Sequence, residues 1–315
     1  MYSPYLFARA SELLSLRDIA STAPDVRKLL PILEPVNANL SSLSTCLNIW
    51  HGDIVVILNP YQNEYSGNQN AVLALNTHMQ TLMNTKPNII IGVLITANTN
   101  FQSLMQYINN NQNRRIALLY DNASLSNAEI SSLSALSSVH YHVILNNTLQ
   151  HHQYSLLPIN KIIVVNDCFR KLAKNADYNG PEPFTNLNQY VGVNFLGFGD
   201  YTITGRVFAP GGGQPSAVAA HLIYKELTNN TIWIKHFVSA NTQRGGADVA
   251  TMFLDVSDQI TQFVPQNINQ FGSNIGLSHY YDCSRRRHSP GLAKNKEYQI
   301  SHHISFMLDL LNGRI

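Results

Sequence analysis

Short apolar runs rich in Ile, Val and Leu recur six times along the first half of the chain, and each is closed by a polar residue. Their starts lie about 22–35 residues apart, near the length of one strand–helix unit. Continuous apolar runs of this length are typical of parallel strands that are covered on both faces. The runs are Leu29–Val36, Ile54–Asn59, Ile89–Thr96, Ile116–Asp121, His140–Asn146 and Ile162–Asp167.

The segments between these runs have helical periodicity. Asn68–Asn84 places apolar side chains on one helical face, and Phe101–Ile108 and Asn127–Leu136 predict shorter helices. Thr148–Pro158 is weakly periodic, so a loop is expected there. The pattern predicts an α/β fold, a (β/α)8 TIM-like barrel, with an open doubly wound sheet as the alternative. A Rossmann fold is disfavoured because no GxGxxG follows the first run.

The final third is less regular. We expect a short helix at Phe169–Asp177 and a seventh strand at Tyr190–Tyr201. Ala217–Tyr224 and Ile232–Val238 fit an antiparallel hairpin. In the competing interpretation Pro215–Leu227 is a helix and Ile232–Val238 is the eighth parallel strand. Either version is expected to close the barrel.

The C-terminal part predicts a helix at Asp248–Phe263, an irregular passage at Val264–Pro290 and a last helix at Glu297–Leu311. No Ser/Gly linker or change in composition divides the chain. We therefore predict a single domain over residues 1–315, with 264–315 as a C-terminal extension.

Composition excludes several classes of protein. With 44% hydrophobic residues and a net charge of +2, the chain is neither disordered nor strongly basic, so no overall field marks a nucleic-acid or membrane binder. Only 13% of the residues are charged, and 35 Asn supply much of the polarity. Cys46, Cys168 and Cys283 form no CxxC pair, which disfavours a disulfide framework or a zinc ribbon. No leader-like or membrane-length apolar stretch is present, so a cytoplasmic protein without membrane contact is expected.

Several segments together resemble a known family. They are Met1–Leu6, Glu12–Leu14, Pro31–Val36, Ile57–Pro60, Asn175–Tyr178, Gly197–Tyr201, Ala217–His221 and His236–Ser239. The chain is similar over nearly its whole length to uncharacterised bacterial TIM-barrel-like proteins related to the phage beta-protein family. The resemblance implies a TIM-like barrel that is often encoded beside a small nuclease-like protein in mobile or defence-associated loci. It implies no established reaction and no catalytic residue.

Polar residues at the strand ends are the first candidates for chemistry, since the carboxyl ends of barrel strands meet at one mouth. Asp and Asn at these positions also commonly cap the next helix or stabilise a turn. Asp200 lies between glycines, which permit close approach of a ligand or a β-bulge. The candidate catalytic acids are Glu34, Asp121, Asp167 and Asp200, and the candidate ligand-binding amides are Asn59 and Asn166.

His221 and His236 are predicted to face each other if the hairpin interpretation holds, because they are placed symmetrically about its turn. Paired imidazoles near acids suit general acid–base catalysis or metal binding, although a structural role fits them equally well. No third ligand is evident, so a divalent metal ion is only one alternative. The segment from Gly211 to Ser216 fits an anion-binding nest or a plain flexible connection, and it is not a P-loop.

Arg285, Arg286 and Arg287 form the one dense basic run. It predicts a local patch for phosphate, nucleic acid or an acidic partner, or a solvated loop. Cys168 lacks a recognisable base and is expected to be a small residue near the rim.

Two functions follow. The first, which the resemblance implies, is a non-nuclease barrel component of a bacterial two-gene module of the anti-phage defence type that binds a small nuclease-like protein and a phosphorylated ligand. The alternative is a phosphodiester-type hydrolase with an acidic and histidine site at the barrel mouth. Three or more of these side chains within ligand distance of one metal ion would favour the enzyme. A mouth filled by apolar side chains would favour the binding protein.

Overall fold

The computed structural model describes residues 1–211, 215–243 and 245–315. Gly212–Gln214, the centre of the expected anion-binding nest, lie outside the described residues. The described chain divides into two compact units. Unit 1 contains residues 1–9, 29–167 and 190–201, and unit 2 contains residues 10–28, 168–189 and 202–315. The single domain with an extension from residue 264 stays a prediction.

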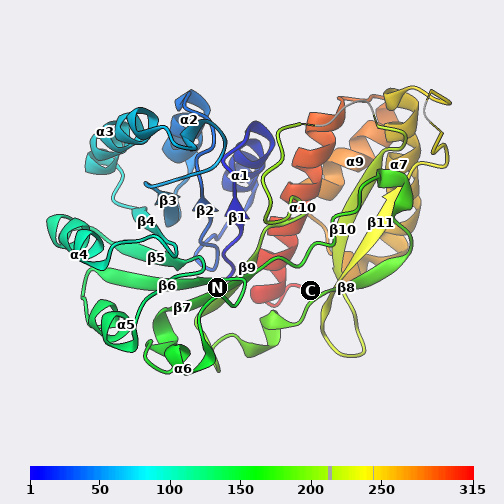
Figure 1. The fold of residues 1–315 in the computed structure, drawn as a ribbon. Helices are drawn as coiled ribbons and strands as arrows, with labels where there is room; N and C mark the ends of the chain where they lie inside the picture. Colours follow the sequence, from blue (N-terminus) through cyan, green and yellow to red (C-terminus); the bar gives the residue numbers. More distant parts are fainter. Residues whose placement is uncertain (212–214, 244) are drawn as a thin grey trace. The chain divides into compact units, whose positions relative to one another are not determined.

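Unit 1 is a nearly closed barrel of eight parallel strands (Figure 1), which confirms the predicted TIM-like α/β class. All six apolar runs supply neighbouring strands that run in the same direction. The strand order is β1-β2-β3-β4-β5-β6-β7-β9. The bounds are β1 (Tyr5–Leu6), β2 (Ile32–Leu33), β3 (Ile54–Ile57), β4 (Ile89–Ile95), β5 (Ile116–Tyr120), β6 (Val139–Leu145), β7 (Ile162–Asn166) and β9 (Gly197–Asp200).

Helices connect the successive strands from β2 to β7 and lie outside the ring of strands (Figure 1). They are α2 (Ser41–Ile49), α3 (Gln69–Thr85), α4 (Phe101–Asn110), α5 (Asn127–Ser134) and α6 (His151–Tyr154). Asn68, Asn100 and Ser126 cap α3, α4 and α5 by accepting a backbone N–H in the first turn. The helix α6 is a single turn, and the rest of the segment before β7 is mostly irregular, as its weak periodicity predicts.

The N-terminal segment brings the two ends of the sheet together. Tyr2 forms an isolated parallel bridge with Phe198 of β9, and the N–H of Ser3 donates to the Phe198 carbonyl at 2.8 Å. A Cβ on Gly199 would lie 1.9 Å from the carbonyl oxygen of Ser3. The glycine is therefore needed where β9 meets the N-terminal segment, which gives it a structural role that requires no ligand.

This closure corrects two expectations about the strands. The seventh strand is only Gly197–Asp200, because Leu187–Tyr190 is a 3₁₀ turn. The eighth parallel strand is Tyr5–Leu6, not Ile232–Val238. A two-residue strand has no apolar run long enough to reveal it.

Unit 2 contains a separate antiparallel sheet in the order β10-β11-β8. Its strands are β8 (Pro181–Thr185), β10 (Ala219–Lys225) and β11 (Ile232–Val238). The hairpin interpretation is therefore confirmed, and the helix proposed for Pro215–Leu227 is wrong. Neither strand of the hairpin belongs to the barrel sheet. The prolines of β8 concealed it in the sequence, yet they are tolerated because β8 lies at a sheet edge.

The helices of unit 2 are α1 (Ala10–Thr22), α7 (Val249–Phe263), α8 (Ile268–Phe271), α9 (Ile275–Arg286) and α10 (Leu292–Leu311). The irregular passage expected at Val264–Pro290 is thus wrong over most of its length. Asn274 caps α9, whose apolar residues Leu277 and Tyr280 enter the core together with Phe253 of α7. The helix expected at Phe169–Asp177 is also wrong, since only Asn175–Asp177 form a 3₁₀ turn.

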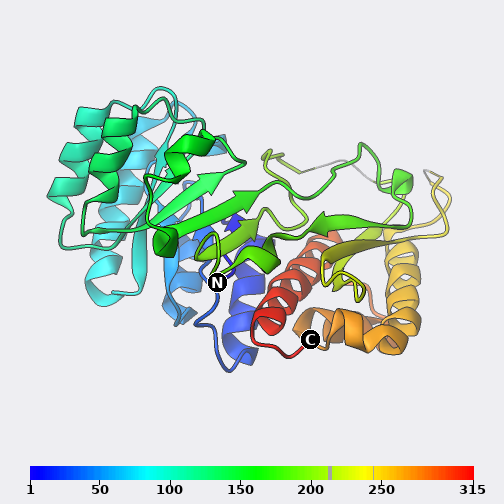
Figure 2. The same cartoon turned by 90° about the horizontal axis from the view of Figure 1, so that it is seen from below.

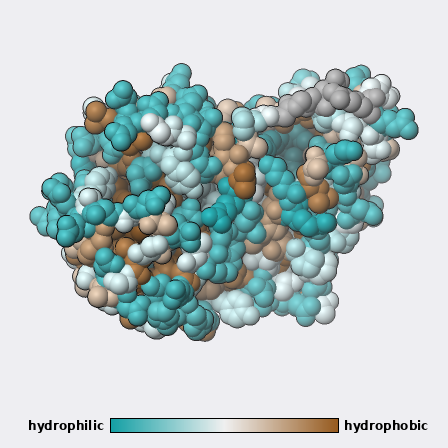
Figure 3. Space-filling model, in the orientation of Figure 1, coloured by the Kyte–Doolittle hydropathy of each residue, from teal (hydrophilic) through white to brown (hydrophobic). Residues whose placement is uncertain are grey.

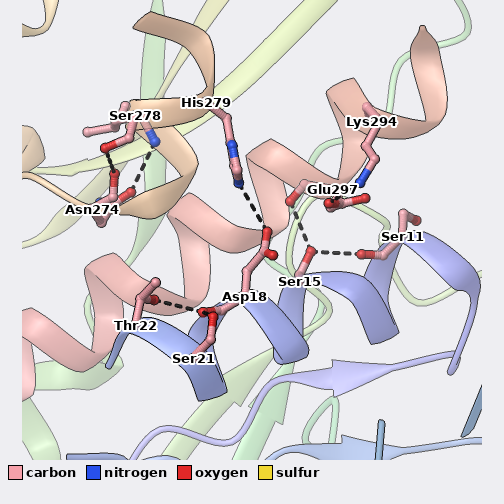
Figure 4. A network of polar contacts seen from close by, with 11 residues as sticks. Ser11, Ser15, Asp18, Ser21, Thr22, Asn274, Ser278, His279, Lys294 and Glu297 are labelled. Carbon is pink, nitrogen blue, oxygen red and sulfur yellow. Dashed lines mark hydrogen bonds and ion pairs between the residues drawn. The ribbon is translucent and has the colours of Figure 1, made fainter. Parts of the chain in front are cut away.

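Polar contacts connect α1 with α9 and α10, and α10 lies beside both of them (Figure 2). His279 Nε2 lies 3.1 Å from Asp18 Oδ2, and the Ser15 hydroxyl donates to the carbonyl of Glu297 at 2.9 Å (Figure 4). Polar side chains cover much of the face shown in Figure 3, in keeping with the many Asn residues. Among the described helices, none is long and apolar enough to cross a membrane.

Candidate active site at the barrel mouth

The carboxyl of Glu34 lies directly after β2 and is completely buried. The Tyr5 hydroxyl donates to its Oε2 at 2.7 Å, and the Gln62 amide donates to the same oxygen at 2.8 Å. The other oxygen, Oε1, has no partner of hydrogen-bonding geometry among the described residues. Two side chains therefore hold Oε2 of this carboxyl, and the backbone N–H of Tyr61 also acts on the group.

Burial sets the protonation of this carboxyl. It raises the pKa of Glu34 to about 7, although hydrogen bonds from Tyr5 and Gln62 and the backbone N–H of Tyr61 lower it. The carboxylate of Asp121 adds a small further rise. Burial and the neighbouring Glu34 also raise the pKa of Tyr5, which stays a neutral donor. Glu34 is thus a group that exchanges a proton near neutral pH.

Asp121 follows β5 and lies at the same end of the barrel. Its Oδ2 accepts a hydrogen bond from the Tyr61 hydroxyl at 3.0 Å, and the residue keeps 8% of its surface exposed. The registers from β2 to β5 place Glu34 and Asp121 on the same face of the sheet. On the opposite face Leu58 and Val93 line a cavity of about 310 Å³ with residues of α3 and α4, so the two acids face the barrel interior.

The other two acids lie elsewhere. Asp200 ends β9 on the face opposite that of Asp121, where it is buried and accepts a hydrogen bond from the Tyr2 hydroxyl at 3.0 Å. Asp167 is exposed beyond the end of β7. Glu34 and Asp121 are therefore the pair that the fold brings together, and Asp167 and Asp200 are not shown to join them.

The two candidate amides at the strand ends, Asn59 and Asn166, differ in their hydrogen bonds. Asn59 Oδ1 accepts the N–H of Leu94 at 2.8 Å, and its Nδ2 donates to the Leu94 carbonyl at 2.9 Å. Asn59 thus continues the β3–β4 ladder with its side chain. Asn166, the last residue of β7, is half-buried, and its Oδ1 has no hydrogen-bond partner among the described residues.

His221 and His236 face each other in unit 2, as the sequence predicts. They are paired residues of β10 and β11, and their Nδ1 atoms lie 2.8 Å apart. His236 Nε2 lies 3.2 Å from Oε1 of Glu182, whose other oxygen accepts a hydrogen bond from Arg170 at 2.7 Å. Because a carboxylate only accepts, His236 carries its proton on Nε2, and His221 Nδ1–H then donates to His236 Nδ1.

Both imidazoles are neutral in this arrangement. Burial lowers the pKa of His221 well below its usual value, and the neighbouring His236 lowers it further. Burial also lowers the pKa of His236, against the opposing effect of Glu182. The Tyr178 ring contacts both imidazoles, with centroids 4.4 and 4.8 Å away. The pair belongs to unit 2, whereas Glu34 and Asp121 belong to unit 1.

The basic run ends α9 in unit 2, where carboxylates of the same unit pair with it. Arg285 and Arg286 pair with Asp282, and Arg287 Nη1 lies 2.7 Å from Oδ2 of Asp258. These pairs offset much of the positive charge that the sequence concentrates there.

No group of three or more His, Cys, Asp or Glu able to hold a metal ion occurs within residues 1–211, 215–243 and 245–315. Polar side chains lie at this end of the barrel, among them Glu34, Gln62, Tyr61 and Asp121. The outcome that would have favoured a metal-dependent enzyme, three or more of these side chains around one metal ion, is therefore not met among the described residues.

Sequence reasoning missed the phenols and the amide around Glu34. Tyr5 lies on the unrecognised strand β1, and Tyr61 and Gln62 follow the end of β3. Tyr201 packs against Tyr5 with ring centroids 4.8 Å apart, and its hydroxyl accepts a hydrogen bond from Asn146 at 3.2 Å. The signal available was position, since Tyr61 and Tyr201 each follow a strand end that the sequence did reveal.

Comparisons with protein-family models, with curated proteins and with solved structures found no match to this chain. The resemblance to the phage beta-protein family and the small nuclease-like partner stay predictions.

Proposed function

We propose that this protein is a hydrolase that uses Glu34 as its general acid at the mouth of the barrel. The observation that carries the proposal is a buried carboxyl with a pKa of about 7, placed at the carboxyl end of a barrel strand and held by the side chains of Tyr5 and Gln62. A carboxyl of this kind is protonated often enough near pH 7 to donate, and strong enough as an acid to do so quickly. Barrel enzymes carry their catalytic groups at this end.

The described site favours acid–base chemistry over metal-assisted cleavage of a phosphodiester. The carboxylate of Asp121 acts on Glu34 and also repels an anionic substrate. A phosphodiester needs cations or metal ions to stabilise the charge that develops in its transition state. Support is therefore stronger for an uncharged substrate.

A panel of chromogenic substrates tests the proposal. Purified protein is incubated with 4-nitrophenyl esters, 4-nitrophenyl glycosides, bis(4-nitrophenyl) phosphate and peptide anilides. We expect hydrolysis in at least one class, a loss of roughly 100-fold or more in Glu34→Gln, and a decline as pH rises through about 7. Glu64→Gln is the matched control, because Glu64 is an exposed acid of the same loop that binds the N–H of Ala38. A fully active Glu34→Gln variant, or a panel without any hydrolysis, contradicts the proposal.

The role in a two-gene defence module, in a cytoplasmic setting, is a separate proposal that rests on the family resemblance. The exposed side chains of Arg285, Arg286 and Arg287 are the surface on which a nucleic acid or an acidic partner is expected. Replacing all three by Glu is expected to abolish co-purification with the neighbouring gene product, or binding of labelled RNA and DNA. If the variant still binds the neighbouring gene product, RNA and DNA as the wild type does, the basic run does not have this role.

A further inference from the structure

The two acids at the mouth differ in environment and are contacted by consecutive residues of one loop. Gln62 binds Glu34, and Tyr61 binds Asp121. Gln62 has extended backbone angles, φ −97° and ψ 156°, and neighbouring side chains of an extended segment point apart. This loop therefore contacts both carboxyls.

Two carboxyl groups in different environments at one end of a barrel suit the cleavage of an acetal. One must be protonated to assist the leaving oxygen, and the other must be charged to activate water or stabilise positive charge at carbon. Glu34 is fully buried and bonded to Gln62, whereas Asp121 keeps 8% of its surface exposed and accepts a hydrogen bond from the Tyr61 hydroxyl. The environments thus assign the acid to Glu34 and the base to Asp121.

Aromatic and phenolic groups surround this pair. Tyr61 is 47% exposed although its hydroxyl is bonded to Asp121, so part of its ring is open to a ligand. The C–H groups on the face of a sugar ring carry partial positive charge and pack well on the negative face of an aromatic ring. Tyr5 and Tyr201 add hydroxyls at the same end of the barrel.

Resting on the proposed hydrolase function, we propose that the substrate is an uncharged glycoside, with Glu34 as acid, Asp121 as base and Tyr61 as the ring platform. Glu34 gives its proton to the glycosidic oxygen while the bond between that oxygen and the anomeric carbon breaks. Asp121 takes a proton from a water molecule whose oxygen forms the new bond to the anomeric carbon. Proton exchange with solvent then restores both groups, and the anomeric configuration is inverted.

The glycosidic oxygen must reach a carboxyl that is buried in the free protein. Two routes are available at Glu34. The oxygen can displace the amide of Gln62 from Oε2, or it can approach Oε1, which lacks a hydrogen-bond partner among the described residues. The first route replaces the Gln62 contact with a contact to substrate.

The test compares aryl glycosides with good and poor leaving groups. A panel of 4-nitrophenyl α- and β-glycosides of hexoses and pentoses identifies a substrate, and the matching 2,4-dinitrophenyl glycoside is then prepared. Glu34→Gln is expected to lose roughly 100-fold or more on the nitrophenyl compound and far less on the dinitrophenyl compound, whose leaving group needs little protonation. Asp121→Asn is expected to lose activity on both. Proton NMR of the first sugar released should show the inverted anomer.

Several outcomes overturn the inference. They are equal losses on both leaving groups in Glu34→Gln, an Asp121→Asn variant with full activity, or a retained anomer. If esters or phosphodiesters are hydrolysed in a Glu34-dependent way while every glycoside is inert, the glycoside assignment fails and the proposed hydrolase stands. If no class is hydrolysed, both fail. Circular dichroism and thermal unfolding of each variant show that a loss of activity is not a loss of fold.

Discussion

The buried carboxyl of Glu34 makes a quantitative prediction about stability. Its pKa is raised from 4.5 to about 7 in the folded protein. Each unit of such a shift corresponds to about 1.4 kcal/mol, so the change amounts to about 3 kcal/mol. The folded state binds the proton more tightly than the unfolded state. The stabilisation is therefore fully present below pH 4.5 and is lost as pH rises to about 7.

Glu34→Gln isolates this effect, because a glutamine has the shape of the protonated acid and cannot lose a proton. At pH 4 the variant and the wild type should be similar in stability. At pH 8 the wild type carries a buried carboxylate, and the variant should be more stable by about 3 kcal/mol. The hydrogen bonds from Tyr5 and Gln62 can both be accepted by the new amide oxygen.

Guanidinium unfolding at several pH values between 4 and 8 measures this difference. Tryptophan fluorescence follows the transition through Trp50 in unit 1 and Trp233 in unit 2, Trp233→Phe isolates the signal of the barrel, and Glu64→Gln serves as the control. Carbon-13 NMR of the Glu34 carboxyl gives the pKa directly. A stability difference that does not change between pH 4 and pH 8, or a carboxyl that titrates near its ordinary value, would refute the reasoning and remove the basis of the proposed acid.

Two further predictions concern the stability of each unit. Gly199→Ala places a Cβ against the Ser3 carbonyl and should cost about 3 kcal/mol or more in unfolding free energy, whereas Gly211→Ala, with no atom within 4 Å, should be neutral in the same denaturation assay. His236→Ala should lower the free energy of unfolding by about 2–4 kcal/mol at pH 7, since it removes the partner of the His221 Nδ1–H and of Glu182 Oε1. Nitrogen-15 NMR of the wild type should show His236 protonated at Nε2. Because the folded state lowers the pKa of both imidazoles, the wild type should lose stability as pH falls below about 6.5, and the variant should lose less.

The barrel was predictable because its information is local. Each strand from Ile54 to Asn166 contains an apolar run, interrupted by two histidines in β6, and each run is separated from the next by a segment that forms a helix or short turns. The strand β1 was not predictable in this way. Two residues carry no periodicity, and Tyr5–Leu6 pair with β2 only because the chain returns to close the sheet.

In the hairpin of unit 2, sequence position predicted one contact of the histidines and could not predict another. Symmetry about a turn placed His221 opposite His236, and the structure confirms this. The third strand β8 contains two prolines and has no alternating pattern, so Glu182 could not be recognised as the partner that fixes the tautomer. The hydrogen bonds between His236 and Glu182 and between His221 and His236 therefore depend on a residue, Glu182, that only the tertiary structure brings into place.

The candidate site has the same division between local and tertiary information. The sequence identified Glu34 and Asp121 as residues that follow strands, because each comes at or near the end of an apolar run. It could not distinguish them from Asp200, because the face on which a side chain lies depends on register across several strands. It also could not give Glu34 its pKa, which is set mainly by burial. What makes one acid of the series suited to proton transfer is therefore the closure of the barrel around it.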